Sequence, residues 1–239
     1  PIASVRLEVP AGSKDLYKTT LPWSGFENIW ALTIKVDETT FPDMNFRRWL
    51  HDTTFGYDYR LKEEEIVGVE SITMVNYGIK DLTGIAYFPD LKSLNCSNNK
   101  LTELDLSECP GLETVNCASN YLASLNVSKN ALLTSLNCSR NSPLTELDVS
   151  QNTALTSLDC SYCALAMLDV SQNAALTSLN CKGNKMTIVD VSQNTNLASL
   201  DCGSNKSLTM LDVSQNAALK SLNCEWCNLS ELYLPKGST

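Results

Sequence analysis

The chain has 239 residues, 43% of them hydrophobic, with a net charge of −9 and a pI near 4.6. This length allows one or two domains, and an acidic chain without a Lys/Arg run is a poor match for nucleic acid or an anionic membrane surface. No apolar stretch reaches the roughly 18 to 20 residues of a spanning helix, so no transmembrane segment is predicted.

The N-terminal third, residues 1–68, has no internal repeat and is expected to form a cap domain of its own. Its alternating and helical patterns predict strands at 5–9 and 30–36, a turn at 10–12, and short helices at 43–50 and 62–66. Together these elements would cover the open edge of whatever repeat follows, because an uncovered strand edge offers unpaired backbone groups to other chains.

The rest of the chain, residues 69–239, is periodic. Cysteines recur every 21 or 22 residues in a Leu-x-x-Leu-x-Cys frame, at Cys96, Cys117, Cys138, Cys160, Cys181, Cys202 and Cys224. Each is followed by a second half-unit that varies around the form Leu-x-x-Leu-Asp-Leu/Val-x-x-Asn, as in residues 165–173. A period in this range indicates one short coil stacked on itself many times.

Details of the register predict where the coils begin and where they differ. Met74 lies 22 residues before Cys96, so the first coil is expected to begin near Val69. Two coils carry one extra residue, at 141–143 and 205–207, and are expected to bulge at that corner. Because Leu-x-Cys and Leu-x-Val alternate with a period of two, stacking predicts two parallel sheets on opposite sides of a flat tube.

This frame resembles the leucine-rich repeat family, and within it the nested bacterial subclass with 21-residue repeats found in surface proteins of Bacteroides-like bacteria. The resemblance covers about residues 69–234 in seven consecutive coils. It implies an α+β chain dominated by a right-handed parallel β solenoid, with two short strands per coil and a mixed N-terminal cap. It also implies an exported, noncatalytic binding module, and the abrupt start at Pro1 fits a chain from which an export signal has been removed.

The cap resembles the helix-loop-helix of such proteins, in which a calcium loop often sits. Aligned on that loop, Leu61 takes position eight, Glu65 position twelve, and Tyr59 replaces the glycine at position six. Most ligand positions are lost, so a calcium-free remnant is favoured over a site using Asp52, Asp58 and Glu65. We therefore predict no metal and no cofactor.

Ten cysteines and two Cys-x-x-Cys pairs invite a disulfide, redox or zinc interpretation. The register instead favours turn residues of the repeat. Cys163 and Cys227 fall at a position that other coils fill with Asn, and Cys109 does the same in the second half-unit. The expected role of these Asn positions is to turn an amide inward and satisfy buried backbone groups, which cysteine does only weakly. The column cysteines are expected to be buried, reduced core residues.

No sequence motif indicates catalysis. The chain lacks Gly-x-Ser-x-Gly, a phosphate loop and a histidine pair. Acidic residues recur at one position of the coil, at Asp105, Asp148, Asp169, Asp190 and Asp212, but a uniform column of carboxylates in water has nothing to push its pKa values apart. We predict that the protein is not an enzyme; His51, Asp52 and Asp58 form the one cluster worth mutating if activity appeared.

Two outward faces compete as binding surfaces. The cysteine-side face presents small polar residues such as Ser157 and Asp159, which offer little anchoring energy. The second face combines acids with three exposed apolar residues, and isolated aromatic residues stand at the turns. The candidate binding residues are Glu103, Asp105, Glu146, Asp148, Met167, Asp169, Ile188, Asp190, Met210, Asp212, Tyr162 and Trp226.

Two functions from different classes follow. The first is a secreted or cell-surface module, with a lipid anchor as one form of attachment, that binds an unknown protein or glycan. The second is a structural spacer or assembly module joined by weak self-association through its C-terminal coil, residues 229–234. Light scattering with and without that coil would separate them.

Overall fold

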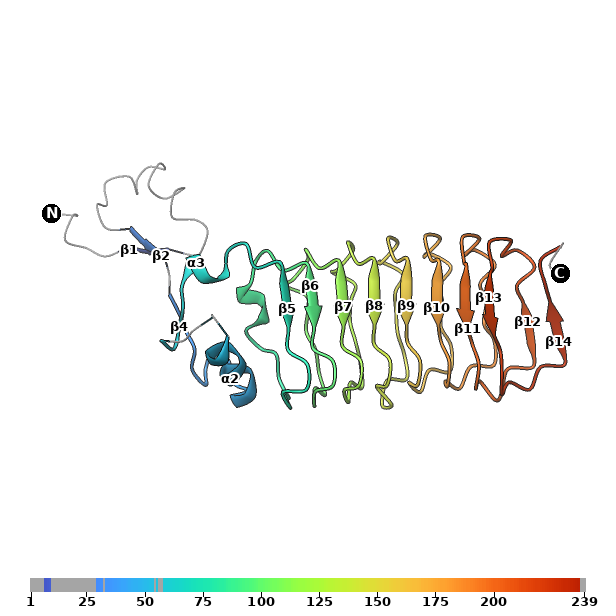
Figure 1. Ribbon diagram of the computed structural model, residues 1–239, viewed down its shortest axis with the longest axis horizontal. Helices are drawn as coiled ribbons and strands as arrows, with labels where there is room; N and C mark the ends of the chain where they lie inside the picture. The colour runs from blue at the N-terminus through green and yellow to red at the C-terminus, as the bar shows by residue number, and fades with distance from the viewer. Residues whose placement is uncertain (1–6, 10–28, 32, 54, 56–57, 237–239) are drawn as a thin grey trace.

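A computed structural model describes residues 7–9, 29–31, 33–53, 55 and 58–236 (Figure 1). Near the N-terminus, β1 (Leu7–Val9) pairs in parallel with β2 (Ile29–Ala31), and β3 (Ile34–Lys35) pairs antiparallel with β4 (Arg60–Leu61). The strand expected at 30–36 is therefore split between two sheets. The expected turn at 10–12 lies outside the described residues.

Both expected helices are present, with slightly different ends. Helix α2 spans Met44–Asp52 and α3 spans Glu63–Ile66. Asp43 caps α2 because its Oδ1 accepts hydrogen bonds from the backbone N–H groups of Asn45 (2.7 Å) and Phe46 (2.9 Å). Its other oxygen accepts one from the N–H of Lys80 at 2.8 Å, which ties the helix start to the first coil.

Helix α2 covers the first coil, as expected. It buries Phe46, Trp49 and Leu50, and the Trp49 indole N–H donates to the carbonyl of Thr73 at 3.2 Å. The Asn45 amide donates to the carbonyl of Gly78 at 3.0 Å. These bonds satisfy backbone groups at the edge of the first coil, so this end of the stack is closed. The domain boundary at residues 68 and 69 stays a prediction.

The parallel solenoid is confirmed. Eight strands form one sheet in which each strand pairs with the strand of the next coil (Figure 1). They are β5 (Ser71–Thr73), β6 (Ser93–Asn95), β7 (Thr114–Asn116), β8 (Ser135–Asn137), β9 (Ser157–Asp159), β10 (Ser178–Asn180), β11 (Ser199–Asp201) and β13 (Ser221–Asn223). The pairing of Ser71 with Ser93 confirms a first coil of 22 residues.

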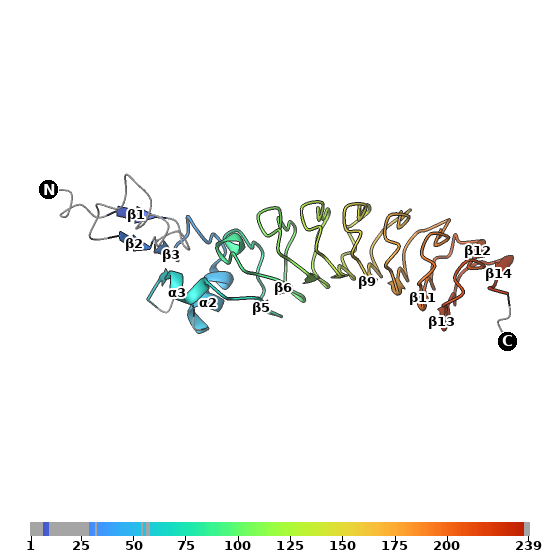
Figure 2. The ribbon, with the colours of Figure 1, turned by 90° about the horizontal axis from the view of Figure 1, so that it is seen from above.

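The second side of the tube differs from the continuous sheet that the alternation predicts. It contains the 3₁₀ helix η3 (Ile85–Tyr87), isolated bridges from Asp105 through Asn126 to Asp148, and a two-stranded pair of β12 (Met210–Asp212) and β14 (Glu231–Tyr233). Figure 2 shows this side opposite the eight-stranded sheet. On this side, backbone hydrogen bonds between neighbouring coils form mainly at the corner just before each second half-unit, as between the Lys185 N–H and the Leu165 carbonyl at 2.9 Å. Around Asp169 and Asp190, where neither a bridge nor a strand pair forms, the middle of the segment is left for side chains to line.

The inward-facing asparagines confirm the structural role expected of them. The Asn184 amide donates to the carbonyls of Cys160 and Cys181, both at 3.0 Å, and its Oδ1 accepts from the N–H of Leu165 at 3.0 Å. One side chain thus satisfies three buried backbone groups in two coils. The asparagines of the second half-units form a second ladder, in which each amide donates to two carbonyls of the preceding coil, as Asn173 does to Val149 at 3.0 Å and Asn152 at 2.8 Å. Within the described chain the Oδ1 atoms of this ladder have no hydrogen-bond partner: Asn130, Asn152, Asn173, Asn194 and Asn216.

The asparagines three residues after each column cysteine, such as Asn141 and Asn184, form the first ladder. Cysteine replaces asparagine in this ladder only in the coil that follows one with an extra residue. The extra residue closes a turn in which the Leu144 N–H donates to the carbonyl of Asn141 at 2.9 Å, and Leu208 and Asn205 form the same bond at 3.0 Å. The Leu144 N–H therefore does not need the side-chain oxygen of an asparagine in the next coil as its acceptor. The Cys163 thiol keeps only the donor function, toward the carbonyl of Cys138 at 3.4 Å.

Burial of the cysteine column is confirmed for six of its seven members. Cys96, Cys117, Cys138, Cys160, Cys181 and Cys202 are fully buried, and all ten cysteines of the chain are free thiols. The expectation is wrong for Cys224, which is half-buried, as is Cys227. Both lie in the last described coil, on whose outer side no further described coil packs.

Candidate functional site

The outward residues of the second half-units form what we call the acidic face. It has two parallel columns, because each short segment turns two side chains outward on either side of a buried Leu or Val. The first column runs Asp81, Glu103, Ser124, Glu146, Met167, Ile188, Met210; the second runs Thr83, Asp105, Asn126, Asp148, Asp169, Asp190, Asp212. Every one of the predicted face residues in these columns is exposed.

Three apolar side chains on this face project into water. Met167, Ile188 and Met210 are 74%, 69% and 51% exposed and belong to successive coils. Most apolar side chains in the solenoid are fully buried, so these three form an apolar row of the kind that marks interaction sites.

The acids beside that row are held in place by the backbone. Oδ1 of Asp169 accepts a hydrogen bond from the N–H of Ser171 at 2.9 Å, and the other column acids repeat this bond two residues on. The same bond holds the pKa of Asp169 below its usual value, and the pKa values of Asp105, Asp148 and Asp212 are lowered by the equivalent serines. All four shift in one direction, so they form a fixed anionic column without an acid and base pair.

Grooves between coils follow the apolar row. One of about 590 Å³ lies between Met167 and Ile188, and a second of about 390 Å³ lies between Ile188 and Met210. Their walls include Leu168 and Gln193, which the sequence reasoning did not single out. A similar groove of about 380 Å³ lies between the coils of Asn126 and Asp148, so grooves are a general feature of this side of the tube.

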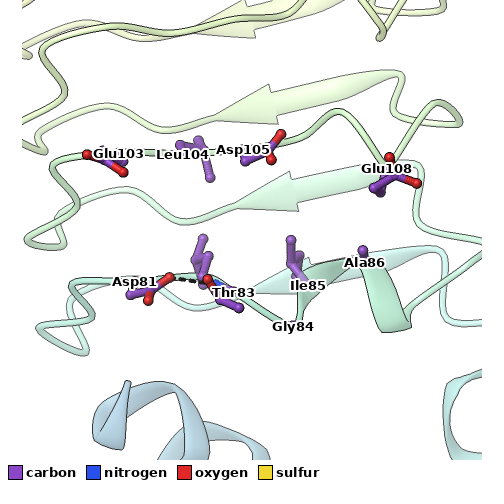
Figure 3. Close-up of a pocket in the computed structure, with 10 residues that line it drawn as sticks. Asp81, Thr83, Gly84, Ile85, Ala86, Glu103, Leu104, Asp105 and Glu108 are labelled. Atoms are coloured by element: carbon purple, nitrogen blue, oxygen red, sulfur yellow. Dashed lines mark hydrogen bonds between the residues drawn. The ribbon is translucent and has the colours of Figure 1, made fainter. Parts of the chain in front are cut away.

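An acid-lined pocket opens at the N-terminal end of the same face (Figure 3). Glu103, Asp105 and Glu108 reach it from one coil, and Asp81 from the coil before, next to Gly84. Asp81 is the first-coil counterpart of Glu103, seven residues after Met74 as Glu103 is seven after Cys96, so the repeat register could have found it.

The eight-stranded face, as far as the chain is described, presents a different surface. Its side chains are small and bonded to one another, as between Thr114 Oγ1 and Ser93 Oγ at 2.8 Å. Paired strands leave this surface flat, which limits the contact area that a partner side chain could bury.

The two predicted aromatic residues are not part of the acidic face. Tyr162 and Trp226 occupy left-handed turns, with φ of 54° and 60°, and line none of the grooves just described. Tyr162 lies under the Arg140 guanidinium, 4.9 Å from its ring centre, and over Gly183, where a Cβ would come within 2.7 Å of the ring. Trp226 is 79% exposed.

In the cap, Lys62 occupies the position between two of the residues considered for calcium. Its Nζ lies 2.9 Å from Asp58 and 3.9 Å from Glu65, and the contact lowers the pKa of Asp58. Asp52 instead faces Arg48 at 3.7 Å. Tyr59, aligned with the glycine of a calcium loop, has the left-handed conformation with φ of 62°. The three carboxylates form ion pairs, and across the described residues no group of three His, Cys, Asp or Glu side chains is placed to hold a metal ion.

Comparison with known proteins agrees with this architecture. Residues 89–130 match the family of leucine-rich repeats (2 copies), and the solenoid has the leucine-rich repeat fold. A search of curated proteins gave no match.

Among the solved structures that are similar to this chain, two share the fold with TM-scores above 0.5. Internalin C2 from Listeria monocytogenes is 16% identical with a TM-score of 0.67, over 83% of this chain and 97% of that one. The Leptospira interrogans LRR protein LIC12759 is 22% identical with a TM-score of 0.58, over 65% of this chain and 45% of that one. The functional domain of InlJ from Listeria monocytogenes, which includes a cysteine ladder, is 24% identical with a TM-score of 0.40, over 85% and 71% of the two chains. Within the described chain, every helix is too short or too polar to cross a bilayer.

Proposed function

We propose that this protein is a noncatalytic secreted or cell-surface module that binds a protein partner through its acidic face. The observation that carries the proposal is the row of Met167, Ile188 and Met210, exposed on three successive coils and separated by grooves. Exposed apolar side chains stabilise nothing in the free solenoid, and their burial by a partner would contribute about 25 cal/mol per Å² of apolar surface.

Protein is favoured over glycan because of where the aromatic residues lie. Sugar rings stack on exposed flat aromatic surfaces. Here Arg140 covers one face of the Tyr162 ring, and Trp226, although 79% exposed, lines neither groove of the acidic face. The two grooves are lined by aliphatic, acidic and neutral polar side chains, and no aromatic ring is among their lining residues.

The test is a pull-down from cells or medium that contain the natural surroundings of the protein, with wild type and Met167→Asp/Met210→Asp as baits. Leu132→Ser is a matched control, since Leu132 is also exposed (57%) but lies outside the two columns. Partner recovery should fall at least tenfold for the double variant and stay unchanged for the control. Equal recovery by all three baits would rule out this surface.

A second function, a spacer or assembly module, is favoured by the last described coil. Leu232 and Leu234 are 42% and 49% exposed there, and Cys224 is half-buried. Self-association through this coil would make the mass seen by light scattering rise with concentration. A Leu232→Ser/Leu234→Ser variant should then stay monomeric, whereas a monomeric wild type would remove this alternative.

A further inference from the structure

Each coil of the acidic face offers a partner one apolar and one anionic contact side by side. Met167 and Asp169 are two residues apart on one extended segment, and the pairs Ile188/Asp190 and Met210/Asp212 repeat this on the next coils. Two outward side chains of such a segment stand about 6.6 Å apart. A complementary partner therefore needs an apolar row and, parallel to it, a cationic row.

The coil repeat restricts the backbone that can carry those two rows. Successive coils of a parallel stack are about 4.8 Å apart, so Met167 and Met210 are separated by about 9.6 Å. An α-helix laid along the stack repeats a face every 5.4 Å, and its residues i and i+7 are about 10.5 Å apart, close to two coil steps.

Other backbones fit the three apolar residues less well. In an extended strand, side chains on one face recur every 6.6 Å or so, which falls out of step with the coils by about 2 Å per contact. A polyproline II helix repeats every 9 Å or so and would leave Ile188 without a matching side chain. A helix is the backbone that gives each coil its own contact.

We infer that the acidic face binds an amphipathic α-helix of the partner, lying along the solenoid axis, with apolar side chains in the grooves beside Met167, Ile188 and Met210 and Lys or Arg side chains toward Asp169, Asp190 and Asp212. The inference rests on the proposed function and specifies the partner. The grooves, of about 590 and 390 Å³, have room for Leu-sized side chains.

The rest of the face extends the same complementarity toward the N-terminus. From Asp105 to Asp212 is five coil steps, about 24 Å, which a helix of about 16 residues would span. A basic residue at its far end would reach the acid-lined pocket of Asp81, Glu103 and Glu108. The apolar half of the face anchors the helix, and the acidic half sets its direction.

Synthetic 18-residue peptides test this directly with the full chain. The probe carries Leu along one helical stripe and Lys along one flank. A second peptide has Glu in place of Lys, and a third is the probe with two central residues replaced by proline, which prevents the helix. Binding is followed by fluorescence anisotropy at about 0.15 M salt, where long-range attraction is screened. The wild-type protein should bind the Leu/Lys helix at least tenfold more tightly than either other peptide.

Variants with matched controls assign the site. Met167→Ser/Ile188→Ser/Met210→Ser should weaken binding of the Leu/Lys helix at least tenfold, and Leu132→Ser less than twofold. Asp169→Asn/Asp190→Asn/Asp212→Asn should weaken it at least fivefold; it keeps the turn hydrogen bond, since native Asn126 Oδ1 makes it with the N–H of Ser128 at 3.0 Å. A control of equal charge change, Glu64→Gln/Glu113→Gln/Glu225→Gln, should weaken it less than twofold.

The outcomes separate this inference from the proposed function. Equal weakening by both charge variants, or equal affinity for the proline peptide, would overturn the helix while the pull-down still tests the face. If the Met167→Asp/Met210→Asp bait loses its partner but the Leu/Lys helix shows no preference, the helix inference falls and the proposed function stands. If that bait keeps its partner, both fall.

Discussion

The exchange of asparagine for cysteine in the first ladder gives a quantitative prediction. In the Asn184→Cys variant, a thiol in the geometry of Cys163 still donates to the carbonyl of Cys160. The carbonyl of Cys181 keeps the hydrogen bond that it accepts from the Asn205 amide at 3.1 Å. The N–H of Leu165, however, loses its acceptor and stays buried. A buried N–H without a partner costs about 1–3 kcal/mol, so the variant should be less stable by about that amount.

Two measurements check this value. Urea unfolding gives the loss of free energy, and Asn184→Ala should lose more, about 2–5 kcal/mol, because the carbonyl of Cys160 also loses its donor. Amide hydrogen exchange reports the local site: the Leu165 amide should exchange at least about fivefold faster in Asn184→Cys. A variant as stable as wild type, with an unchanged Leu165 amide, would refute the reasoning.

A double-mutant cycle tests the coupling to the extra residue. Deleting Ser142 removes the turn in which the Leu144 N–H finds its acceptor. The deletion should cost about 1–3 kcal/mol more in the native chain than in Cys163→Asn, where an amide oxygen can replace that acceptor. Additive effects would show that the coincidence of extra residue and cysteine has no energetic basis.

Four further results are expected. Trp49→Phe should lose about 1 kcal/mol in thermal unfolding, since it removes one hydrogen bond to the first coil and keeps most of the packing. The lowered pKa values of the column acids predict stability that is complete above the unfolded pKa near 3.9 and lost as pH falls through the folded value; urea midpoints between pH 7 and 3 should show this, and Asp148→Asn should reduce the dependence. Iodoacetamide at pH 8 should modify Cys224 before the six buried column thiols, among which burial raises the pKa of Cys96 to about 12; equal rates would contradict the burial. Millimolar calcium should release no heat in isothermal titration, because Asp58 and Glu65 already form ion pairs with Lys62; a defined stoichiometry would show a working site.

The sequence by itself determined the length and register of the coils. The column from Cys96 to Cys224 defines the coil length, the first coil near Val69 and the two extra residues, and the period of two predicts which side chains point outward. The coil length and register can be predicted because neighbouring coils must present the same apolar side chains to one another, and these side chains recur visibly in the sequence. The domain boundary after residue 68 and the choice of binding residues stay predictions.

Only the tertiary structure decided how the two sides of the tube differ. Leu-x-Cys and Leu-x-Val alternate alike, so the sequence predicts two sheets, yet continuous pairing forms on one side and grooves open on the other. The half-buried state of Cys224 and the link between Cys163 and the turn at Asn141 were likewise invisible in the pattern. Each depends on which backbone groups of neighbouring coils find partners, and that is settled by packing between coils and not by the alternation within one.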